Sequence, residues 1–420
     1  MKVCVIGNGG REHALAWRLS ISPSVTKVYA IPGSAAMSDC AELVGIDWQQ
    51  SDHLIRFLKD NHVDLVVVGP EAPLVAGLAD ELNKAGIPVF GPSKAAAQLE
   101  GSKVFAKDLM KKYNIPTAAY GVFHKVDEAK EFIAQTGAPI VVKADGLAAG
   151  KGVVVAMTVE EANAAVEDML SGNRFGEAGS TVVIEEFMEG EEASLLAFVD
   201  GKTVVPMIAS QDHKRIFDGD KGPNTGGMGT YAPAPVLTDA LRDEAMKTIL
   251  EPMVAAMEKE GMPYVGCLYA GLMITPQGPK VVEFNARFGD PETQVVLPLL
   301  DSDLGQIMMA CATGTLTADM VKWKDSSAAC VILASKGYPE TSSKGDVIHG
   351  DIKQHDTTIV FHSGTKLMGD EYVTNGGRVL GVVGLGKDLR TALDRAYGRI
   401  EHINFEGMQY RTDIGAKAFK

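Results

Sequence analysis

Three polar side chains at alternate positions, Glu283, Asn285 and Arg287, are the residues of this chain best suited to chemistry. They follow Val281 and Val282, which are typical of a buried β-strand. On an extended strand, side chains two residues apart point to the same face. A carboxylate and an amide oxygen on one face suit a hard cation such as Mg²⁺, and an arginine beside them suits a phosphate. A solvated strand edge with a salt bridge is the alternative, but the crowding of polar groups favours a binding site.

A glycine-rich segment between two apolar strands carries a second set of candidate residues. The expected strand 139–143 ends in Lys143, the segment 144–152 contains Lys151, and a further strand is expected at 153–156. A Walker A loop is excluded, because that motif requires a helix and a Ser or Thr after its lysine. The pattern predicts a hairpin that folds over phosphates. Two lysines bracket the segment, which favours this interpretation over a plain flexible hairpin.

The first hundred residues contain short apolar segments that alternate with helical patterns. Strands are expected at 3–6, 28–30, 65–68 and 89–90. Strands that alternate with helices imply a parallel, doubly wound sheet. Ligands bind at the carboxyl ends of the strands in such a sheet, which makes Glu71 a candidate for contacting ribose hydroxyls. An ordinary acid at a helix start is the alternative.

A glycine loop, Gly7-Asn8-Gly9-Gly10, follows the first strand and at first suggests a dinucleotide site. Glu12, however, stands where that fingerprint requires a small residue, and no acid lies about 20 residues further on to bind a ribose. NAD binding is therefore disfavoured. A glycine loop at a helix N-terminus still suits an anion, because free N–H groups and the helix dipole point at the ligand. A tight turn without a ligand is the alternative.

The segment from Gln211 to Tyr231 is expected to be the longest loop of the chain. It begins with Asp212, interleaves acids and bases, and contains a glycine-rich stretch at 226–229. Loops of this length inside compact enzymes are usually functional lids or disordered inserts. The mixture of charges, without a block of one sign, favours a loop at a binding site.

Composition limits the classes of function. The 420 residues carry a formal net charge of −14, which argues against a general nucleic-acid or anionic-membrane binder. Hydrophobic residues make up 46% and aromatic residues 6%, a composition typical of α/β enzymes. Five scattered cysteines without a CxxC pair predict free thiols in a reducing compartment. With no signal peptide and no uncharged stretch long enough to span a bilayer, we expect a soluble, cytoplasmic protein.

The spacing of Glu283, Asn285 and Arg287 resembles the magnesium-binding strand of ATP-grasp ligases. Residues 287–294, together with 224–229, resemble the motifs of one member family, the phosphoribosylamine–glycine ligases. The resemblance extends from the Gly7 loop to the C-terminus. One departure concerns a second metal carboxylate, which many ATP-grasp enzymes carry on the preceding strand. No acid is present near Ala270, where it would stand.

The resemblance implies an α/β fold in three parts. Residues 1–101 would form an N-terminal Rossmann-like domain around the doubly wound parallel sheet. Residues 102–325 would form an ATP-grasp α+β domain with a hinged lid subdomain at about 120–188. Residues 326–420 would form a small, mostly β domain, and because chemistry-bearing residues are sparse there, we expect its role to be structural.

The resemblance also implies ligands and roles for individual residues. It places ATP against Lys103, Lys143, Gly146, Gly150, Lys151, Gly152, Glu185, Glu186, Phe187, Met188 and Glu192. It places the substrates against Gly9, Gly10, Arg11, Glu71, Asp212, Arg287, Asp290, Pro291 and Glu292. Glu283 and Asn285 would hold Mg²⁺, with Mn²⁺ as an alternative. Arg287, Asp212 and Lys143 would act in catalysis, with Asp212 on the ammonium group of glycine.

The implied reaction is the ATP-dependent ligation of glycine to 5-phospho-β-D-ribosylamine through a glycyl phosphate, in purine biosynthesis. Its products are glycinamide ribonucleotide, ADP and phosphate. A transient contact with the enzyme that supplies the unstable amine is also expected. Three alternatives stay open at this point: another ATP-grasp ligase or carboxylase, a nicotinamide oxidoreductase, and a non-catalytic nucleotide sensor.

Overall fold

The computed structural model describes residues 1–148, 151–171 and 175–420. Among the residues singled out above, Gly150 lies outside this described part.

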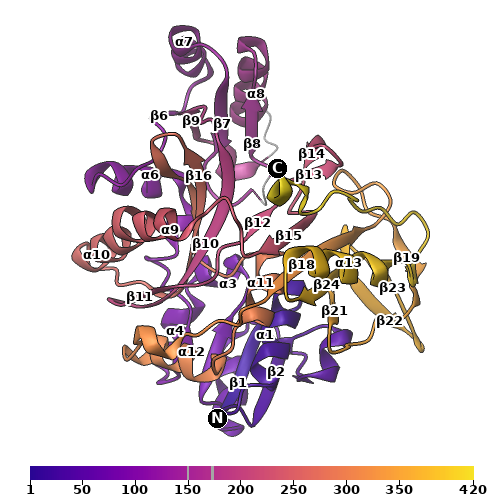
Figure 1. Ribbon diagram of the computed structural model, residues 1–420. Coiled ribbons are helices and arrows are strands. Elements are labelled where there is room, and N and C mark those ends of the chain that lie inside the picture. Colours follow the sequence, from indigo (N-terminus) through magenta and orange to yellow (C-terminus); the bar gives the residue numbers. More distant parts are fainter. Residues whose placement is uncertain (149–150, 172–174) are drawn as a thin grey trace.

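Five parallel strands near the N-terminus form the first sheet (Figure 1), in the order β3-β2-β1-β4-β5. The strands are β1 (Lys2–Gly7), β2 (Lys27–Pro32), β3 (Glu42–Leu43), β4 (Leu65–Val68) and β5 (Val89–Phe90), and the helices are α1 (Gly10–Ser20), α2 (Ser51–Asp60), α3 (Glu71–Ala76) and α4 (Leu78–Lys84). Alternate residues of β1 enter different cores, Val3 and Val5 one, Cys4 and Ile6 the other. Both faces of the sheet are therefore covered, which confirms the doubly wound prediction.

A second sheet, antiparallel and in the order β11-β10-β16-β17, forms the centre of the molecule. Its strands are β10 (Glu191–Asp200), β11 (Val204–Pro206), β16 (Val265–Thr275) and β17 (Gly278–Asn285). The helices of this part are α5 (Gln98–Gly101), α6 (Lys103–Lys112), α9 (Asp239–Ala245), α10 (Glu251–Lys259), α11 (Glu292–Val296) and α12 (Leu304–Thr313). The strands β16 and β17 form an antiparallel hairpin. Ser102 caps the N-terminus of α6, since its Oγ accepts the Phe105 backbone N–H at 3.1 Å.

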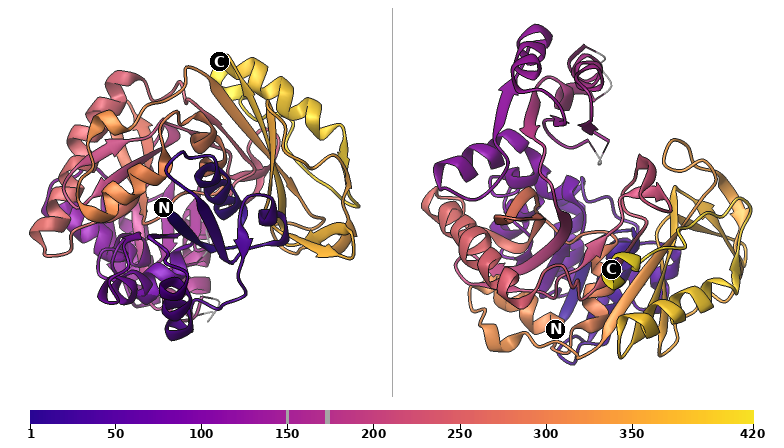
Figure 2. Two further views of the ribbon diagram at one scale, coloured as in Figure 1. Left: turned by 90° about the horizontal axis from the view of Figure 1, so that it is seen from below. Right: turned by 45° about the horizontal axis from the view of Figure 1, so that its top comes forward.

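A third sheet stands out from the rest of the molecule with two helices and a core of its own (Figures 1 and 2). Its order is β6-β9-β7-β8. The elements are β6 (Tyr120–Phe123), α7 (Val126–Thr136), β7 (Ile140–Ala144), β8 (Val153–Ala156), α8 (Val159–Ser171) and β9 (Val182–Glu186). The strands β7 and β8 pair antiparallel, as expected of a glycine-rich hairpin.

The C-terminal part is built on a fourth sheet, in the order β12-β15-β18-β24-β21. Its strands are β12 (Gln211–Asp212), β15 (Gly229–Ala232), β18 (Ser327–Ala334), β21 (Thr358–His362) and β24 (Arg378–Gly386). The remaining elements are β19 (Lys344–Val347), β20 (His349–Gly350), β22 (Thr365–Met368), β23 (Glu371–Asn375), α13 (Leu389–Ile400) and β25 (Ile403–Asn404). Two strands of this sheet come from the central part of the sequence, so the sheet ties both parts together.

The prediction of one long loop at Gln211–Tyr231 is wrong. The segment forms β12 and β15 together with a hairpin of β13 (Arg215–Phe217) and β14 (Lys221–Asn224). The strand β15 pairs antiparallel with β18, much later in the chain. Since β18 lies in a distant part of the sequence, the composition of the glycine-rich segment alone could not indicate this pairing.

Two expectations from composition can be compared with the structure. All five cysteines have free thiols, and Cys4, Cys267, Cys311 and Cys330 are buried. No helix in the described ranges combines the length and the apolar character that crossing a membrane requires.

Candidate active site

The strand β17 presents Glu283 and Asn285 on one face, as predicted. Glu283 lies opposite Gly271 of β16, and Asn285 lies opposite Tyr269. Between Val281 and Glu283 the register shifts by one residue, so Val282 is extra and forms a bulge. The carbonyl oxygen of Val282 accepts a hydrogen bond from Lys143 Nζ at 3.1 Å. The bulge therefore brings Lys143, from the projecting sheet, to the strand that carries the candidate metal ligands Glu283 and Asn285.

A buried group of lysines and one acid lies beside Glu283. Glu185 Oε2 is 3.0 Å from Lys143 Nζ, and its Oε1 is 3.4 Å from Lys107 Nζ. Lys103 Nζ donates to the Gly146 carbonyl at 3.0 Å. Burial raises the pKa of the Glu283 carboxyl, but nearby cations, Lys143 and Lys214 foremost, outweigh burial and hold that pKa below its ordinary value. Glu283 is therefore ionised and able to bind a cation at neutral pH.

Arg287 lies two residues beyond β17, so the expectation of one strand face holds for Glu283 and Asn285 but not for Arg287. Its guanidinium lies between two acids. Its Nη2 is 2.8 Å from Glu100 Oε1, and its Nε is 3.3 Å from Glu71 Oε2. Burial lowers the pKa of Arg287, but the negative charges of Glu100 and Glu71 more than reverse this effect. Arg287 Nη2 also donates to Asn285 Oδ1 at 3.4 Å. These contacts fix a permanently charged guanidinium next to the strand face that carries Glu283.

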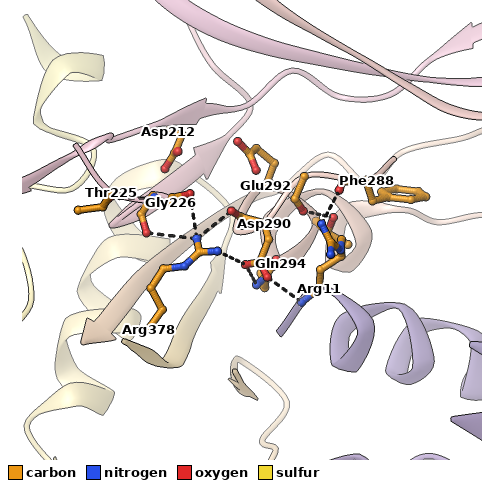
Figure 3. Close-up of polar contacts among 12 residues, drawn as sticks. Arg11, Asp212, Thr225, Gly226, Phe288, Asp290, Glu292, Gln294 and Arg378 are labelled. Carbon is orange, nitrogen blue, oxygen red and sulfur yellow. Dashed lines mark hydrogen bonds and ion pairs between the residues drawn. The ribbon is translucent and has the colours of Figure 1, made fainter. Parts of the chain in front are cut away.

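Asp290 joins three parts of the chain (Figure 3). Its Oδ2 accepts the backbone N–H of Arg11 at 3.3 Å, near the N-terminus of α1. The Nη1 atom of Arg378, from β24, donates to the carbonyl oxygens of Asp290 and Gly226 at 2.8 and 2.9 Å. The glycine loop thus has a carboxylate of the same chain at its helix N-terminus, and the C-terminal part supplies an arginine to the site. The expectation of a structural role for that part did not include this arginine, which lines the first cavity described below.

Two buried carboxylates, Asp212 and Glu292, have oxygens without hydrogen-bond partners among the described residues. Tyr269 donates to Glu292 Oε1 at 2.7 Å, which leaves Oε2 unpaired. Asp212 Oδ2 lies 3.3 Å from Lys214 Nζ without accepting a hydrogen bond. Burial raises the pKa of both carboxyls, and the charge of Asp212 raises that of Glu292 further. The pair offers acceptor oxygens to a ligand with N–H groups.

Two neighbouring cavities share several lining residues, among them Lys143, Glu185 and Glu283. The first, of about 320 Å³, is dominated by charged groups that include Arg11, Arg287 and Arg378. The second, of about 570 Å³, is lined by many apolar side chains and runs along β7, β8 and the segment that follows β9. Both cavities are lined by Lys143, Val153, Glu185, Lys214, Thr225, Val282 and Glu283.

Most of the residues expected at the site line one cavity or both. The first cavity has Arg11, Glu71, Lys103, Lys143, Gly146, Gly152, Glu185, Glu283, Asn285, Arg287, Asp290 and Glu292. The second has Lys143, Glu185, Glu186, Phe187, Met188, Glu192, Asp212 and Glu283. Gly9, Gly10, Lys151 and Pro291 are not among the lining residues, and Lys151 is exposed.

Four charged residues of the first cavity were not among the expected site residues: Glu100, Lys107, Lys214 and Arg378. Lys107 lies one helical turn after Lys103 on α6, so its spacing was a usable signal. Lys214 stands two residues after Asp212 in the charged segment. Arg378 lies in a strand without a recognisable motif, and only the fold brings it to the site.

The glycine loop accommodates a side chain rather than a dinucleotide. A Cβ atom added at Gly7 or Gly69 would lie 2.4 or 2.5 Å from the Glu12 Cγ. These glycines make room for the buried Glu12 between two loops of the first sheet. The space that a dinucleotide fingerprint leaves for a pyrophosphate is therefore filled, which argues against the nicotinamide alternative.

A central antiparallel sheet, a projecting sheet with a glycine-rich hairpin, and a metal-type strand at their junction define the ATP-grasp class. Comparison with known proteins supports this class and narrows it. Sequence profiles of the phosphoribosylglycinamide synthetase N domain, ATP-grasp (A) domain and C domain match residues 1–100, 101–293 and 328–417. The chain belongs to the phosphoribosylglycinamide synthetase family and is an ATP-grasp ligase.

Full-length relatives agree with this assignment. The chain is 53% identical to phosphoribosylamine–glycine ligases of Halalkalibacterium halodurans and of Neisseria meningitidis serogroup A, covering 100% of this chain and 97% and 99% of theirs. The crystal structure of the Thermotoga maritima phosphoribosylamine–glycine ligase superposes with a TM-score of 0.86 at 34% identity, covering 99% of this chain and 100% of that one. The biotin carboxylase domain of Hydrogenobacter thermophilus 2-oxoglutarate carboxylase shares the fold at 17% identity and a TM-score of 0.74, covering 97% of this chain and 91% of that one.

Proposed function

We propose that this chain ligates glycine to 5-phospho-β-D-ribosylamine at the cost of one ATP, in the synthesis of purines. The products are N1-(5-phospho-β-D-ribosyl)glycinamide, ADP and phosphate. The observation that carries this proposal is the position of Glu283 where the two cavities meet, with Asn285 and Arg287 beside it in the first cavity. A nucleotide in the second cavity would extend its phosphates toward the charged groups of the first.

The residues on β17 fit a magnesium ion. Glu283 and Asn285 offer hard oxygen atoms from one strand face, and the surrounding lysines keep Glu283 ionised. When bound there, Mg²⁺ would neutralise phosphate charge on ATP; Mn²⁺, which also takes oxygen ligands, is the alternative metal. No acid stands on β16 opposite these residues, since Glu283 faces Gly271 and Asn285 faces Tyr269.

The second cavity suits the adenosine of ATP. In our proposal the backbone of Glu185 to Met188 contacts adenine, and Glu192 binds the ribose hydroxyls. Valine side chains of β7 and β8 would cover the base. Lys103 and Lys143 would hold the phosphates, and the segment 146–152, including Gly146, Gly150, Lys151 and Gly152, would close over them. Closure of such a segment keeps water away from a reactive intermediate.

The first chemical step forms the activated acid. An oxygen of the glycine carboxylate attacks the γ-phosphorus of ATP, the bond to the β,γ-bridging oxygen breaks, and ADP leaves. Arg287, whose orientation Glu71 and Glu100 fix, would stabilise the charge of the transferring group. The step makes one carboxylate oxygen of glycine part of a phosphate, which is a good leaving group, whereas an oxide ion is not.

The second step forms the amide. The amine of phosphoribosylamine attacks the acyl carbon, the bond from that carbon to the phosphate oxygen breaks, and phosphate leaves. The amine loses one proton to solvent or to the departing phosphate. Asp212 would hold the ammonium group of glycine through its unpaired oxygen, with Glu292 beside it. The Gly9-Gly10-Arg11 loop, Glu71, Asp290 and Pro291 would position the phosphoribosylamine, and Arg378 would add a cation there.

We further propose that residues 1–101, 102–325 and 326–420 act as separate units, with a moving lid at about 120–188. The lid region has its own core, which would let it move as one body. Because phosphoribosylamine is unstable, a cytoplasmic enzyme of this kind would gain from transient contact with the enzyme that makes the amine.

The test is the release of ADP in the presence of ATP and Mg²⁺, with glycine and phosphoribosylamine added singly and together. The proposal predicts stoichiometric ADP and glycinamide ribonucleotide only when both are present. ADP release with another carboxylate and amine instead would remove the substrate assignment while leaving the ATP-grasp class. No ADP under any pairing would favour a nucleotide sensor.

A further inference from the structure

The C-terminal segment contacts His213 and the β13–β14 hairpin, which lie next in the sequence to the site residues Asp212 and Lys214. We infer that Arg411–Lys417, called the C-terminal clasp below, positions Asp212 and Lys214 for ATP binding and catalysis. This inference rests on the proposed function and assigns a task to residues far from the site motifs. In Figure 1 the C-terminus lies beside the β13–β14 hairpin.

The centre of the clasp is Arg411, whose side chain is 1% exposed. Its Nη1 donates to the carbonyl oxygen of Arg215 at 3.1 Å and lies 2.9 Å from Asp220 Oδ1. The remaining guanidinium nitrogens, Nε and Nη2, each donate to Asp413 at 2.8 Å. Asp413 in turn accepts the Gly219 backbone N–H at 2.9 Å. One buried guanidinium therefore connects β13 and the turn that follows it to the C-terminal segment.

A second attachment lies on the other side of Lys214. The Gly415 backbone N–H donates to His213 Nε2 at 3.3 Å, and His213 Nδ1 contacts the Gly229 carbonyl at 2.9 Å. Since a carbonyl oxygen only accepts, Nδ1 carries the proton and Nε2 is free to accept. Burial lowers the pKa of His213 to about 4, so this tautomer is retained at neutral pH. The clasp thus contacts His213 and Arg215, the two residues that flank Lys214 in the sequence.

A third attachment reaches the second cavity. Lys417 Nζ is 2.8 Å from Asp220 Oδ2, and both residues line that cavity. Thr412 adds an exposed contact, since its backbone N–H donates to Asp218 Oδ1 at 2.8 Å and its hydroxyl donates to the other oxygen of Asp218. The clasp therefore reaches the hairpin at several points, and one of its lysines borders the cavity assigned to the nucleotide.

These attachments matter because Lys214 borders both cavities and lies 3.3 Å from Asp212 Oδ2. A displacement of 1 Å in such a group can cost on the order of 100-fold in rate. Arg411, Asp413 and Thr412 do not line either cavity. They are positioning residues that act through Lys214 and Asp212.

The experiment uses the full-length chain with Asp220→Asn, Thr412→Val, and the two changes combined. Asp220 has a φ of 56°, a conformation that asparagine adopts readily, so Asp220→Asn removes charge with little backbone strain. Arg411 keeps Asp413 as a partner in these variants, which protects the fold. Asp325→Asn, at an exposed acid before β18, is the matched control.

Three quantities are measured: hydrogen exchange of residues 211–231, the Kd for ATP, and the kcat and KM of ligation. We expect faster exchange in the combined variant, a Kd for ATP raised about fivefold, and a kcat reduced about tenfold, since positioning governs both. The thermal midpoint and the control variant should stay close to the wild type. If the clasp only stabilised the fold, the thermal midpoint would fall, and there would be no changes in exchange and kinetics specific to this site.

Two outcomes would overturn the inference. Unchanged exchange would mean that the clasp does not hold the hairpin. Faster exchange with unchanged Kd and kcat would mean that the hairpin position does not matter to the site. If the wild type fails to ligate the two substrates, the proposed function falls, and the exchange and ATP titration still decide whether the clasp acts on the nucleotide site.

Discussion

The two cavities that meet at Glu283 differ in what lines them. The first brings acids and bases together, among them the partly buried Glu100 and Arg287 and the buried Glu292. The second exposes more apolar surface, from Val141, Val155, Phe187, Met188 and Met273, although charged residues also line it. Buried charges are costly unless their geometry serves a purpose, whereas apolar walls bind a flat base through contact area alone.

The difference between the cavities separates chemistry from recognition. Groups of the first cavity that act on charge developing during the two steps should lower kcat when changed, whereas its lysines near the ATP phosphates, such as Lys107, should change KM for ATP. Groups of the second would bind ATP equally well before and during reaction, so changing them should raise KM with little effect on kcat. Four predictions test this separation, from the largest expected effect to the smallest.

Replacing Glu283 by glutamine should have the largest effect. The amide cannot supply the anionic oxygen for Mg²⁺, and it leaves the charges of Lys103, Lys143 and Lys214 less compensated. We expect kcat to fall at least about 1000-fold, while the thermal midpoint changes little. Kinetics with saturating substrates and a thermal melt provide the measurement. A kcat within tenfold of the wild type would show that the metal strand is wrongly assigned.

Replacing Arg378 by methionine should lower kcat/KM for phosphoribosylamine about 100-fold, because the turn at Asp290 and the loop at Gly226 lose the guanidinium that joins them. The KM for ATP should change much less. Arg378→Lys, which keeps charge but not the paired contacts, should recover only part of the loss. Equal losses for both substrates would place Arg378 outside the substrate side of the first cavity.

Lys107 should produce a dependence on pH. Burial lowers its pKa to about 8, although Glu185 partly opposes this change. Below pH 8 Lys107 is charged, so Lys107 and Lys143 together carry two positive charges against the one negative charge of Glu185. Above pH 8 Lys107 is neutral, and the charge of Glu185 compensates that of Lys143. The attraction for the phosphates of ATP should therefore weaken as the pH rises from 7 to 9, with KM rising about tenfold, or about 1.4 kcal/mol.

The Lys107→Met variant is the control for this pH effect. Its KM for ATP should already be high at pH 7, and the inflection near pH 8 should be absent. A wild-type profile without that inflection, or a variant that retains it, would assign the titration to another group.

Val155→Ala should have the smallest effect and should act on binding alone. Removing two methyl groups from the half-buried wall of the second cavity should weaken ATP binding by about 1 kcal/mol, or about fivefold in KM. The kcat should stay within twofold of the wild type, as initial rates at saturating ATP would show. A larger loss in kcat than in KM would break the distinction between the cavities.

Much of the first sheet and of the metal strand was predictable because the signals are local. The apolar run of β1 and the spacing of Glu283 and Asn285 are each contained in one short segment of sequence. The lining of the second cavity followed from the family resemblance rather than from the residues themselves.

The rest of the site depends on distant parts of the chain. The contacts of Arg378 join it to Gly226 and Asp290, at separations of 152 and 88 residues. The strands β12 and β15 belong to a sheet that includes β18, far along the chain, and the bulge at Val282 carries no glycine or proline to mark it. Pairing of this kind is set by tertiary packing, which composition and periodicity do not encode.

The central claim is that the glycine carboxylate is phosphorylated and then loses that oxygen to phosphate. The most direct measurement uses glycine labelled with ¹⁸O in both carboxylate oxygens, with ATP and phosphoribosylamine, and mass analysis of the released phosphate. The account predicts one ¹⁸O in each phosphate formed and one retained in the glycinamide ribonucleotide. Phosphate free of ¹⁸O, formed together with the amide, would contradict it.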